Sequence, residues 1–251
     1  MGNKRFILLL LVFVLLFWAV DVSAAPLALP RIGLDVSSSE NPEDVALSLQ
    51  IIALLTVLSL APAMLILMTC FTRIIVVLSF LRSALATQQM PPNQVLIGLS
   101  LFLTFFIMAP IWSEVNQNAL QPYLNSEITQ EEALEKGLAP LREFMFNQTR
   151  EKDLALFVNL SDLPRPDTTE DIPTSTLIPA FAISELTTAF QIGFIIYIPF
   201  IVIDMVVAST LMSMGMLMLP PMMISMPFKL LLFILVDGWN LLVQTLVASF
   251  R

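Results

Sequence analysis

The sequence comprises 251 residues, of which 57% are hydrophobic and 13% charged, with a formal net charge of −8. So apolar a composition lies outside the range of ordinary soluble domains and indicates an integral membrane protein, or a protein built like one. The negative charge argues against nucleic acid as a partner and against a polybasic membrane anchor.

Chemically reactive side chains are few. The sequence has no histidine and a single cysteine, Cys70, which lies in an apolar run. This excludes a disulfide framework, a cysteine–histidine metal site and histidine-based acid–base catalysis. Neither a GxxxxGK[ST] nor a GxGxxG pattern occurs, so nothing indicates nucleotide binding. We therefore expect a protein that is not an enzyme and holds no cofactor or metal.

Residues 1–24 have the three parts of a secretory signal peptide. Two basic residues precede an uncharged apolar run over residues 6–20, and small residues suited to signal peptidase follow, so cleavage is predicted after Ala24. The alternative is an uncleaved anchor, although this run is short for a membrane span. Cleavage places residues 25–45, an irregular segment with several prolines, outside the cytoplasm.

Residues 46–112 are predicted to form a first apolar helical hairpin. The 28 uncharged residues before Arg73 suffice for one membrane-length helix with a kink at Pro62, and residues 95–112 are long enough to cross back. The positive-inside rule places the intervening loop, with Arg73 and Arg82, in the cytoplasm. These arginines are nine residues apart and face opposite sides of a shared helix, so they cannot serve one ligand together. Snorkelling or topology setting is their alternative role.

Residues 113–177 differ sharply from the apolar runs, with twelve acidic and five basic residues and hence a net charge of −7. Apolar residues near helical spacing predict two or three short helices, followed by a proline-rich linker. After signal cleavage and one hairpin this segment lies outside the cytoplasm, as a small periplasmic domain. Its core is too small to stand alone comfortably, so packing against neighbouring subunits is expected; a solvated acidic loop is the alternative.

Residues 178–251 are predicted to form a second apolar hairpin that carries ionisable side chains. Such groups are costly in an apolar run unless they are paired or face water, which makes Glu185, Asp204 and Asp237 candidate functional residues. Glu185 and Asp204 are 19 residues apart, and Lys229 and Asp237 eight, too far for direct pairs along one helix. Pairing between helices or subunits is the economical solution, with interfacial positions at helix ends as the alternative. The first apolar run is expected to be broken at Pro179, Gly193 and Pro199.

The stretch from Asp204 to Lys229 contains eight of the 14 methionines. Four of them recur at every second residue, which is not the period of a helix face: Met212, Met214, Met216 and Met218. With Gly215 and the adjacent prolines Pro220 and Pro221, this pattern predicts a loop or a broken helix. Unbranched thioether side chains are deformable, so the loop is suited to a soft seal; the alternative is that methionine fills irregular gaps between helices.

Four longer stretches carry a family resemblance, and they are residues 68–112, 179–194, 199–209 and 226–243. They include MTCFTRIIVVLSFLRSALATQQMPPNQ, PAFAISELTTAFQIGF, PFIVIDMVVAS and MPFKLLLFILVDGWNLLV. These stretches resemble the FliP/SctR family of type III secretion export-gate proteins, and the predicted signal peptide suits its flagellar branch. The resemblance covers nearly all of the predicted mature chain and is weakest in residues 25–45 and in the acidic segment.

The resemblance implies a homo-pentamer that assembles with FliQ-type and FliR-type proteins into a helical export gate. The gate belongs to the bacterial inner membrane and the flagellar basal body, beside other export components, and unfolded flagellar proteins cross it. Family members are expected to hold the apolar hairpins above the bilayer plane, packed on one another. In that case the helices are apolar as inferred, but they do not span the bilayer.

The resemblance also assigns roles to individual residues. The methionine-rich gasket of the family maps onto Met216, Leu217 and Met218, with Met212 and Met214 just before it. Leu217 interrupts a triple-methionine run of the relatives, which leaves the seal apolar but less pliant. Glu185 lies in an SEL motif and resembles a residue of an intersubunit ion pair. Its partner is not fixed by the sequence, and Arg150 is one candidate.

The sequence thus predicts an all-α, membrane-protein-like fold with two long apolar hairpins and a small helical extracytoplasmic domain, assembled into a helical hetero-oligomer. The predicted function is that of a pore-forming subunit of the flagellar export gate. A secondary transporter or channel subunit that uses Glu185 and Asp204 is the alternative, and a purely structural scaffold is a third. The predicted interface and ion-pair residues are Glu185, Arg150, Lys229, Asp204, Asp237, Arg73 and Arg82.

Overall fold

The computed structural model describes residues 42–251, apart from residues 88, 162–165, 167, 217–218 and 251. The predicted signal peptide and nearly all of the irregular segment after it lie outside the described residues. The chain divides into two compact units, residues 1–52 and 53–251. Everything from the second half of the first described helix onwards, including the candidate site, belongs to the second unit.

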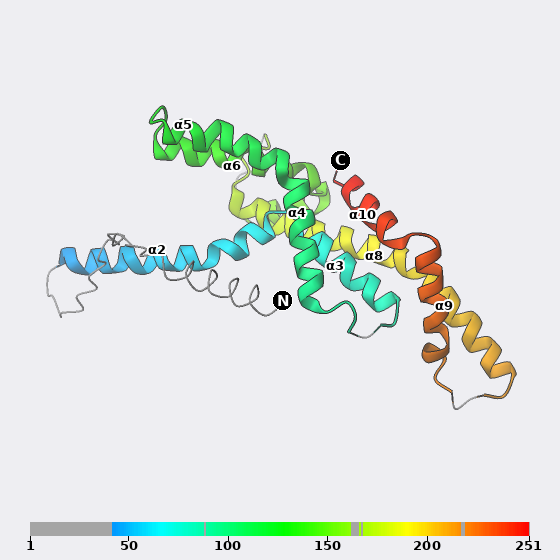
Figure 1. Cartoon of the computed structure of the whole chain (residues 1–251). Helices are drawn as coiled ribbons and strands as arrows, with labels where there is room; N and C mark the ends of the chain where they lie inside the picture. Colours follow the sequence, from blue (N-terminus) through cyan, green and yellow to red (C-terminus); the bar gives the residue numbers. More distant parts are fainter. Residues whose placement is uncertain (1–41, 88, 162–165, 167, 217–218, 251) are drawn as a thin grey trace, which may run out of the picture. The chain divides into compact units, whose positions relative to one another are not determined.

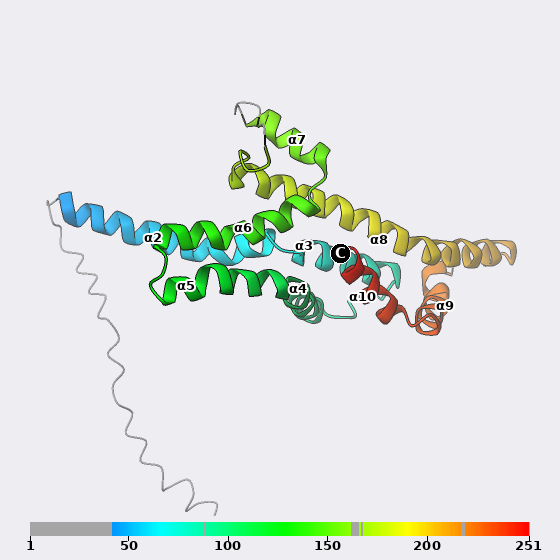
Figure 2. The ribbon, with the colours of Figure 1, turned by 90° about the horizontal axis from the view of Figure 1, so that it is seen from above.

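The described residues form helices and no strand, which confirms the predicted all-α class. In chain order the elements are α2 (Pro42–Leu67), α3 (Phe71–Ala84), α4 (Asn93–Val115), the π-helix η1 (Asn116–Leu120), α5 (Gln121–Leu124), α6 (Gln130–Gln148), α7 (Glu151–Leu160), α8 (Thr174–Ser213), α9 (Pro221–Leu235) and α10 (Gly238–Ala248). Within the second unit α3 packs along α8, with α4 and α6 beside them and α9 against the later part of α8. Figures 1 and 2 show α3 alongside α8 in both views.

Helix α3 shows that residues 72–84 of the segment interpreted as a loop, residues 72–94, are helical, while the cytoplasmic location of that segment stays a prediction. Its buried face follows the helical period, with Ile74, Val77, Leu78 and Leu81 in the core. Arg73 is buried on the same helix, and its charge suggested a loop only because no partner is visible in the sequence. Since α8 supplies that partner, the helix can be buried despite the charge.

Helix α8 is continuous over 40 residues, which corrects the expectation that it is broken at three positions. Pro179 and Pro199 both lie inside it, where each removes one backbone donor but leaves the rest of the hydrogen-bond ladder. Gly193 serves packing instead of breaking the helix. A Cβ atom there would lie 2.6 Å from the Phe80 ring, so glycine lets α3 approach α8 closely.

The acidic segment contains helices α6 and α7 where its spacing predicts helices, but α6, with 19 residues, is longer than expected and α7 has 10. Helix α6 begins at a capping box, in which the Thr129 hydroxyl accepts from the Glu132 amide and the Glu132 carboxylate accepts from the Thr129 amide. The helix that begins at Asn93 does not end near residue 112, since η1 and α5 carry it on to Leu124. The first apolar helix pair therefore extends into the segment that was expected to be separate.

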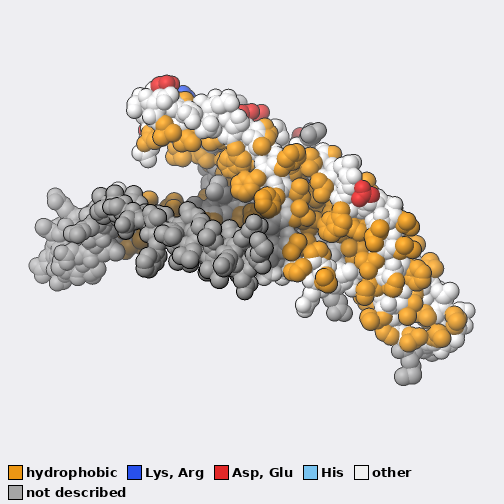
Figure 3. Space-filling model, in the orientation of Figure 1, with side chains coloured by type: hydrophobic (Ala, Val, Ile, Leu, Met, Phe, Trp, Pro, Cys, Tyr) orange, Lys and Arg blue, Asp and Glu red, His pale blue; other side chains and the backbone are white. Residues whose placement is uncertain are grey.

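Much of the apolar surface is exposed. Hydrophobic side chains cover a large part of the face in Figure 3, and Phe102, Phe105 and Phe106 on α4 are all exposed. Among the described residues, two helices are long and apolar enough to cross a membrane, residues 93–124 and 174–213. Helices α9 and α10 would qualify only as a pair, with a bend of 64° between them. Surface of this extent requires lipid or partner subunits.

Candidate functional site

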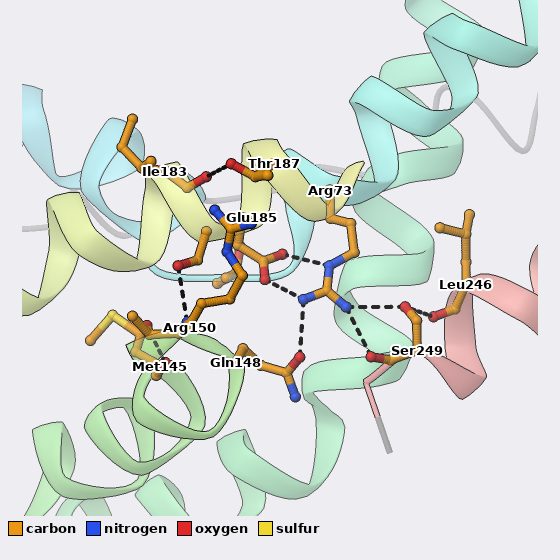
Figure 4. A network of polar contacts seen from close by, with 12 residues as sticks. Arg73, Met145, Gln148, Arg150, Ile183, Glu185, Thr187, Leu246 and Ser249 are labelled. Atoms are coloured by element: carbon orange, nitrogen blue, oxygen red, sulfur yellow. Dashed lines mark hydrogen bonds and ion pairs between the residues drawn. The ribbon is translucent and has the colours of Figure 1, made fainter. Parts of the chain in front are cut away.

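A buried ion pair joins α3 to α8. Arg73 donates from Nε to Glu185 Oε2 at 3.0 Å and from Nη2 to Glu185 Oε1, and the Glu185 side chain is 0% exposed. Arg73 Nη2 also donates to Gln148 Oε1 at the end of α6, at 3.0 Å. Its Nη1 donates to the backbone carbonyl and to Oγ of Ser249, at 2.9 and 3.1 Å. Figure 4 shows these groups converging on the guanidinium.

We call Arg73, Glu185, Gln148, Ser249 and Phe250 the base cluster. The Phe250 ring covers the guanidinium, with its centroid 3.9 Å from Arg73 Cζ. The cluster brings together α3, α6, α8 and the segment after α10, which are remote in sequence. Two of the predicted ion-pair residues, Arg73 and Glu185, thus meet within one chain.

A second polar group lies next to the base cluster, on the preceding residue of α8. Ser184 Oγ donates to Asp153 Oδ2 at 2.7 Å, and the Arg150 amide donates to Ser184 Oγ at 3.1 Å. Arg150 pairs with Asp153 of the same chain at 2.6 Å, so within one chain it is not the partner of Glu185, and the suggested pair between subunits stays a prediction. Burial raises the pKa of Asp153, but hydrogen bonds from Ser184 and Arg150 and the positive charges of Arg150 and Lys152 outweigh it, so the pKa lies below its usual range.

Cys70 is fully buried at the start of α3 and has no disulfide partner among the described residues. Burial raises the pKa of its thiol to about 12, against the opposing effect of a hydrogen bond with Thr104. A thiol in this state is a small apolar packing group without nucleophilic character.

A second interhelical pair lies farther along α8. Lys229 Nζ donates to Asp204 Oδ2 at 2.6 Å, and Ser225 Oγ donates to Asp204 Oδ1 at 2.5 Å. Ser225 and Lys229 are four residues apart and therefore share one face of α9. The Lys229 side chain is 1% exposed and that of Asp204 30%. We call these three residues the tip clamp, because they join α8 and α9 close to the loop between them.

The methionine loop is shorter than the sequence indicates. Helix α8 continues through Ser213, so Met212 lies in its last turn, and α9 starts at Pro221, where proline is favourable because a first-turn amide lacks a helical partner. We use the name methionine loop for residues 214–220. Met214 and Met216 are 69% and 44% exposed, and Gly215 has φ +75°, which favours glycine. Leu217 and Met218 lie outside the described residues.

Two of the predicted ion-pair residues, Arg82 and Asp237, belong to none of these polar groups. Arg82 donates from Nη1 to Asn93 Oδ1 at 2.5 Å and to the Pro91 carbonyl at 3.3 Å, which ties together the ends of the α3–α4 turn. Asp237 precedes α10 with φ +50° and accepts from Asn240 Nδ2 at 3.0 Å. Both stabilise local turns. Across the described parts of the chain, no three Cys, Asp or Glu side chains are grouped in a way that fits a metal ion.

Sequence reasoning missed six members of the base cluster, the tip clamp and the group around Ser184: Gln148, Asp153, Ser184, Ser225, Ser249 and Phe250. A signal existed for Ser184, since it precedes Glu185 in the SEL motif. Ser225 stands four residues before Lys229, which is helical spacing, but the expected loop hid that relation. Asp153 stands three residues after its partner Arg150, a spacing that is visible in the sequence. Gln148, Ser249 and Phe250 have no local signal, because their partner Arg73 lies more than 30 residues away.

Comparison with known proteins supplies the family. Residues 54–246 match the family model described as the FliP family. A flagellar biosynthetic protein FliP of Bacillus subtilis (strain 168) is 62% identical over 217 residues, 86% of this chain and 98% of the relative. Relatives of the same name from Pectobacterium carotovorum and Treponema pallidum are 56% and 49% identical, over 81% and 88% of this chain and 79% and 83% of their own length. This chain belongs to the FliP family.

Proposed function

We propose that this chain is a pore-lining subunit of the flagellar type III protein export gate. In this role five copies assemble with FliQ-type and FliR-type proteins in the bacterial inner membrane, with the acidic segment on the periplasmic side. Unfolded flagellar proteins pass through the channel, and the methionine loop closes around it as a gasket. The relatives named flagellar biosynthetic protein FliP support the flagellar role.

The observation that carries the gasket is the exposure of the methionines at the end of α8 and in the loop. Met212 in the last turn of α8 is 58% exposed, and Met214 and Met216 in the loop are 69% and 44% exposed, while Lys229 of the tip clamp is 1% exposed. The loop therefore presents deformable thioether side chains from a mount that the tip clamp keeps in place. Deformable methionine side chains on helices that are fixed to each other suit a seal that must yield to chains of varying sequence.

The exposed apolar surface supports assembly. Side chains such as Phe102 on α4 and Phe194 on α8 are 78% and 62% exposed, on two helices of membrane length. Subunit interfaces and lipid can both bury such surface, so the hairpins fit either a spanning position or packing above the bilayer.

The transporter alternative requires carboxylates that are available to a substrate or a proton. Glu185 is bound by Arg73 and Asp204 by Lys229, so each is neutralised by a cation of its own chain. This arrangement favours a structural role for both residues.

The decisive experiment measures ion conductance and export in parallel. Met216→Ala combined with Met218→Ala is expected to raise conductance of the purified gate complex in planar bilayers, while secretion of flagellar substrates continues. Met205→Ala is the matched control, since Met205 is 65% exposed but lies on α8 before the loop. Conductance equal to that of the control would count against the gasket.

Native mass measurement tests the assembly separately. Co-expression with the FliQ-type and FliR-type proteins is expected to give a complex with about five copies of this chain. A monomer or dimer under the same conditions would contradict the proposal of an export gate and would favour the transporter alternative.

A further inference from the structure

The base cluster contains a component that the ion pair alone does not require. An arginine has five N–H groups, and here all five have a partner. Glu185 takes two of them and Gln148 one, and the remaining two, both on Nη1, are taken by the carbonyl and the hydroxyl of Ser249. Two of the five donors of the buried guanidinium therefore depend on Ser249, the residue that follows α10.

The next residue covers the face of the same guanidinium. Phe250 lies with its ring centroid 3.9 Å from Arg73 Cζ. The same ring stacks on Phe144 of α6 at 6.4 Å between centroids, and Phe144 contacts Phe181 of α8 edge-on at 5.9 Å. Phe250 thus contacts both the arginine and an aromatic pair, and both kinds of contact require an aromatic ring.

Helix α10 has few other polar attachments. Among the residues that the structure describes, Arg73 makes the only hydrogen bonds that join α10, or the two residues after it, to another helix. At its other end α10 meets α9 at a 64° bend, next to Asp237. Its buried side chains, Leu242 and Leu246, provide apolar contact without fixing a register.

We infer that Ser249 and Phe250 form an intramolecular latch that completes the binding of Arg73 and holds α10 against α3 and α6. When the latch is closed, the guanidinium has no free donor and stays in the geometry that pairs with Glu185. When it is open, two buried N–H groups lose their partners and α10 is attached by its apolar face alone. The inference concerns the folded chain and does not depend on the pore.

Hydrogen exchange measured by mass spectrometry on the full chain in its purified complex tests the latch. Phe250→Leu keeps an apolar side chain but removes the aromatic face. The loss of one desolvated cation–π contact is expected to make amide exchange in the last turn of α10 about tenfold faster. The end of α6, beside Gln148, should respond in the same direction, while α9 stays unchanged.

Two further variants make the result specific. Phe250→Trp retains a flat ring and should restore slow exchange, and Phe228→Leu is the matched control because Phe228 is 54% exposed on α9. Adding Phe250→Leu to Arg73→Lys should bring little further change, since both act on one contact. Unchanged exchange in α10 of Phe250→Leu, or equal effects of Leu and Trp, would overturn the latch.

Discussion

Helix α8 has two regions with opposite surroundings. Near Glu185 all five N–H groups of Arg73 have partners in the base cluster, and the Arg73 and Glu185 side chains are buried. Near Met212 the same helix ends in exposed apolar side chains, and the tip clamp is the polar support. The buried polar groups near Glu185 thus find their partners within one chain, whereas the apolar side chains near Met212 remain exposed in that chain.

The comparison separates folding from assembly. Groups at the base are satisfied without a partner subunit, so changes there should act on the stability of the chain itself. Exposed methionines at the tip contribute little to that stability, so changes there should act on the assembled complex. Four predictions test this division, in order of decreasing effect.

Removing Glu185 should produce the largest loss. Glu185→Ala leaves the Arg73 charge buried without its partner, which costs about 3–5 kcal/mol of unfolding free energy. Chemical unfolding of the purified chain in detergent measures this cost. The double variant Glu185→Leu with Arg73→Met should recover much of the loss, because no charge is then left buried. A single variant as stable as the parent would show that the pair does not support the fold.

Thiol reactivity should differ between base and tip by roughly a thousandfold, because the pKa of Cys70 is raised to about 12 and an exposed cysteine has a pKa near 8.5. The parent chain, whose only cysteine is Cys70, should remain unmodified by N-ethylmaleimide at neutral pH until it is unfolded. Met214→Cys adds a thiol at a 69% exposed position and should be labelled quickly. Rapid labelling of the parent would mean that the base is open.

Close packing midway along α8 should give a smaller effect. Gly193→Ala places a methyl group 2.6 Å from the Phe80 ring and should destabilise the chain by about 1–3 kcal/mol. Gly98→Ala on α4 is the matched control, since no atom lies within 4 Å of its added methyl. Thermal unfolding of both variants measures the difference in stability between them. Adding Phe80→Leu to Gly193→Ala should reduce the loss, and equal melting of the two glycine variants would exclude the close contact.

The pH dependence of α7 should show the smallest of the four effects. The pKa of Asp153 is below its ordinary value of 3.8, because hydrogen bonds from Ser184 and Arg150 outweigh burial. Its stabilisation is therefore complete above the unfolded pKa and is lost as the pH falls through the lower folded pKa. Amide exchange in α7 should accelerate over that range beyond the intrinsic pH effect. Asp153→Asn should abolish the pH-dependent part, and an unchanged profile in that variant would assign it to another group.

The sequence by itself determined the features that depend on local composition. Long uncharged runs predict apolar helices, and the spacing of apolar residues in the acidic segment predicts α6 and α7. Met214, Gly215 and Pro220 predict the loop, because backbone preferences of single residues act over a few positions. Distances along a helix also excluded a direct pair between Glu185 and Asp204, and the structure gives each carboxylate another partner.

Only the tertiary structure decided which charges meet. Arg73 carries the same sequence signal whether it sets topology in a loop or binds Glu185 in a core, since the difference lies in a partner 112 residues away. The same limit applies to Gly193, which looks like a helix breaker until the Phe80 ring is beside it. Burial of α3, the continuity of α8 and the latch at Ser249 and Phe250 all result from contacts between remote segments. Hydropathy and periodicity describe the chain only locally, so they do not predict contacts between remote segments.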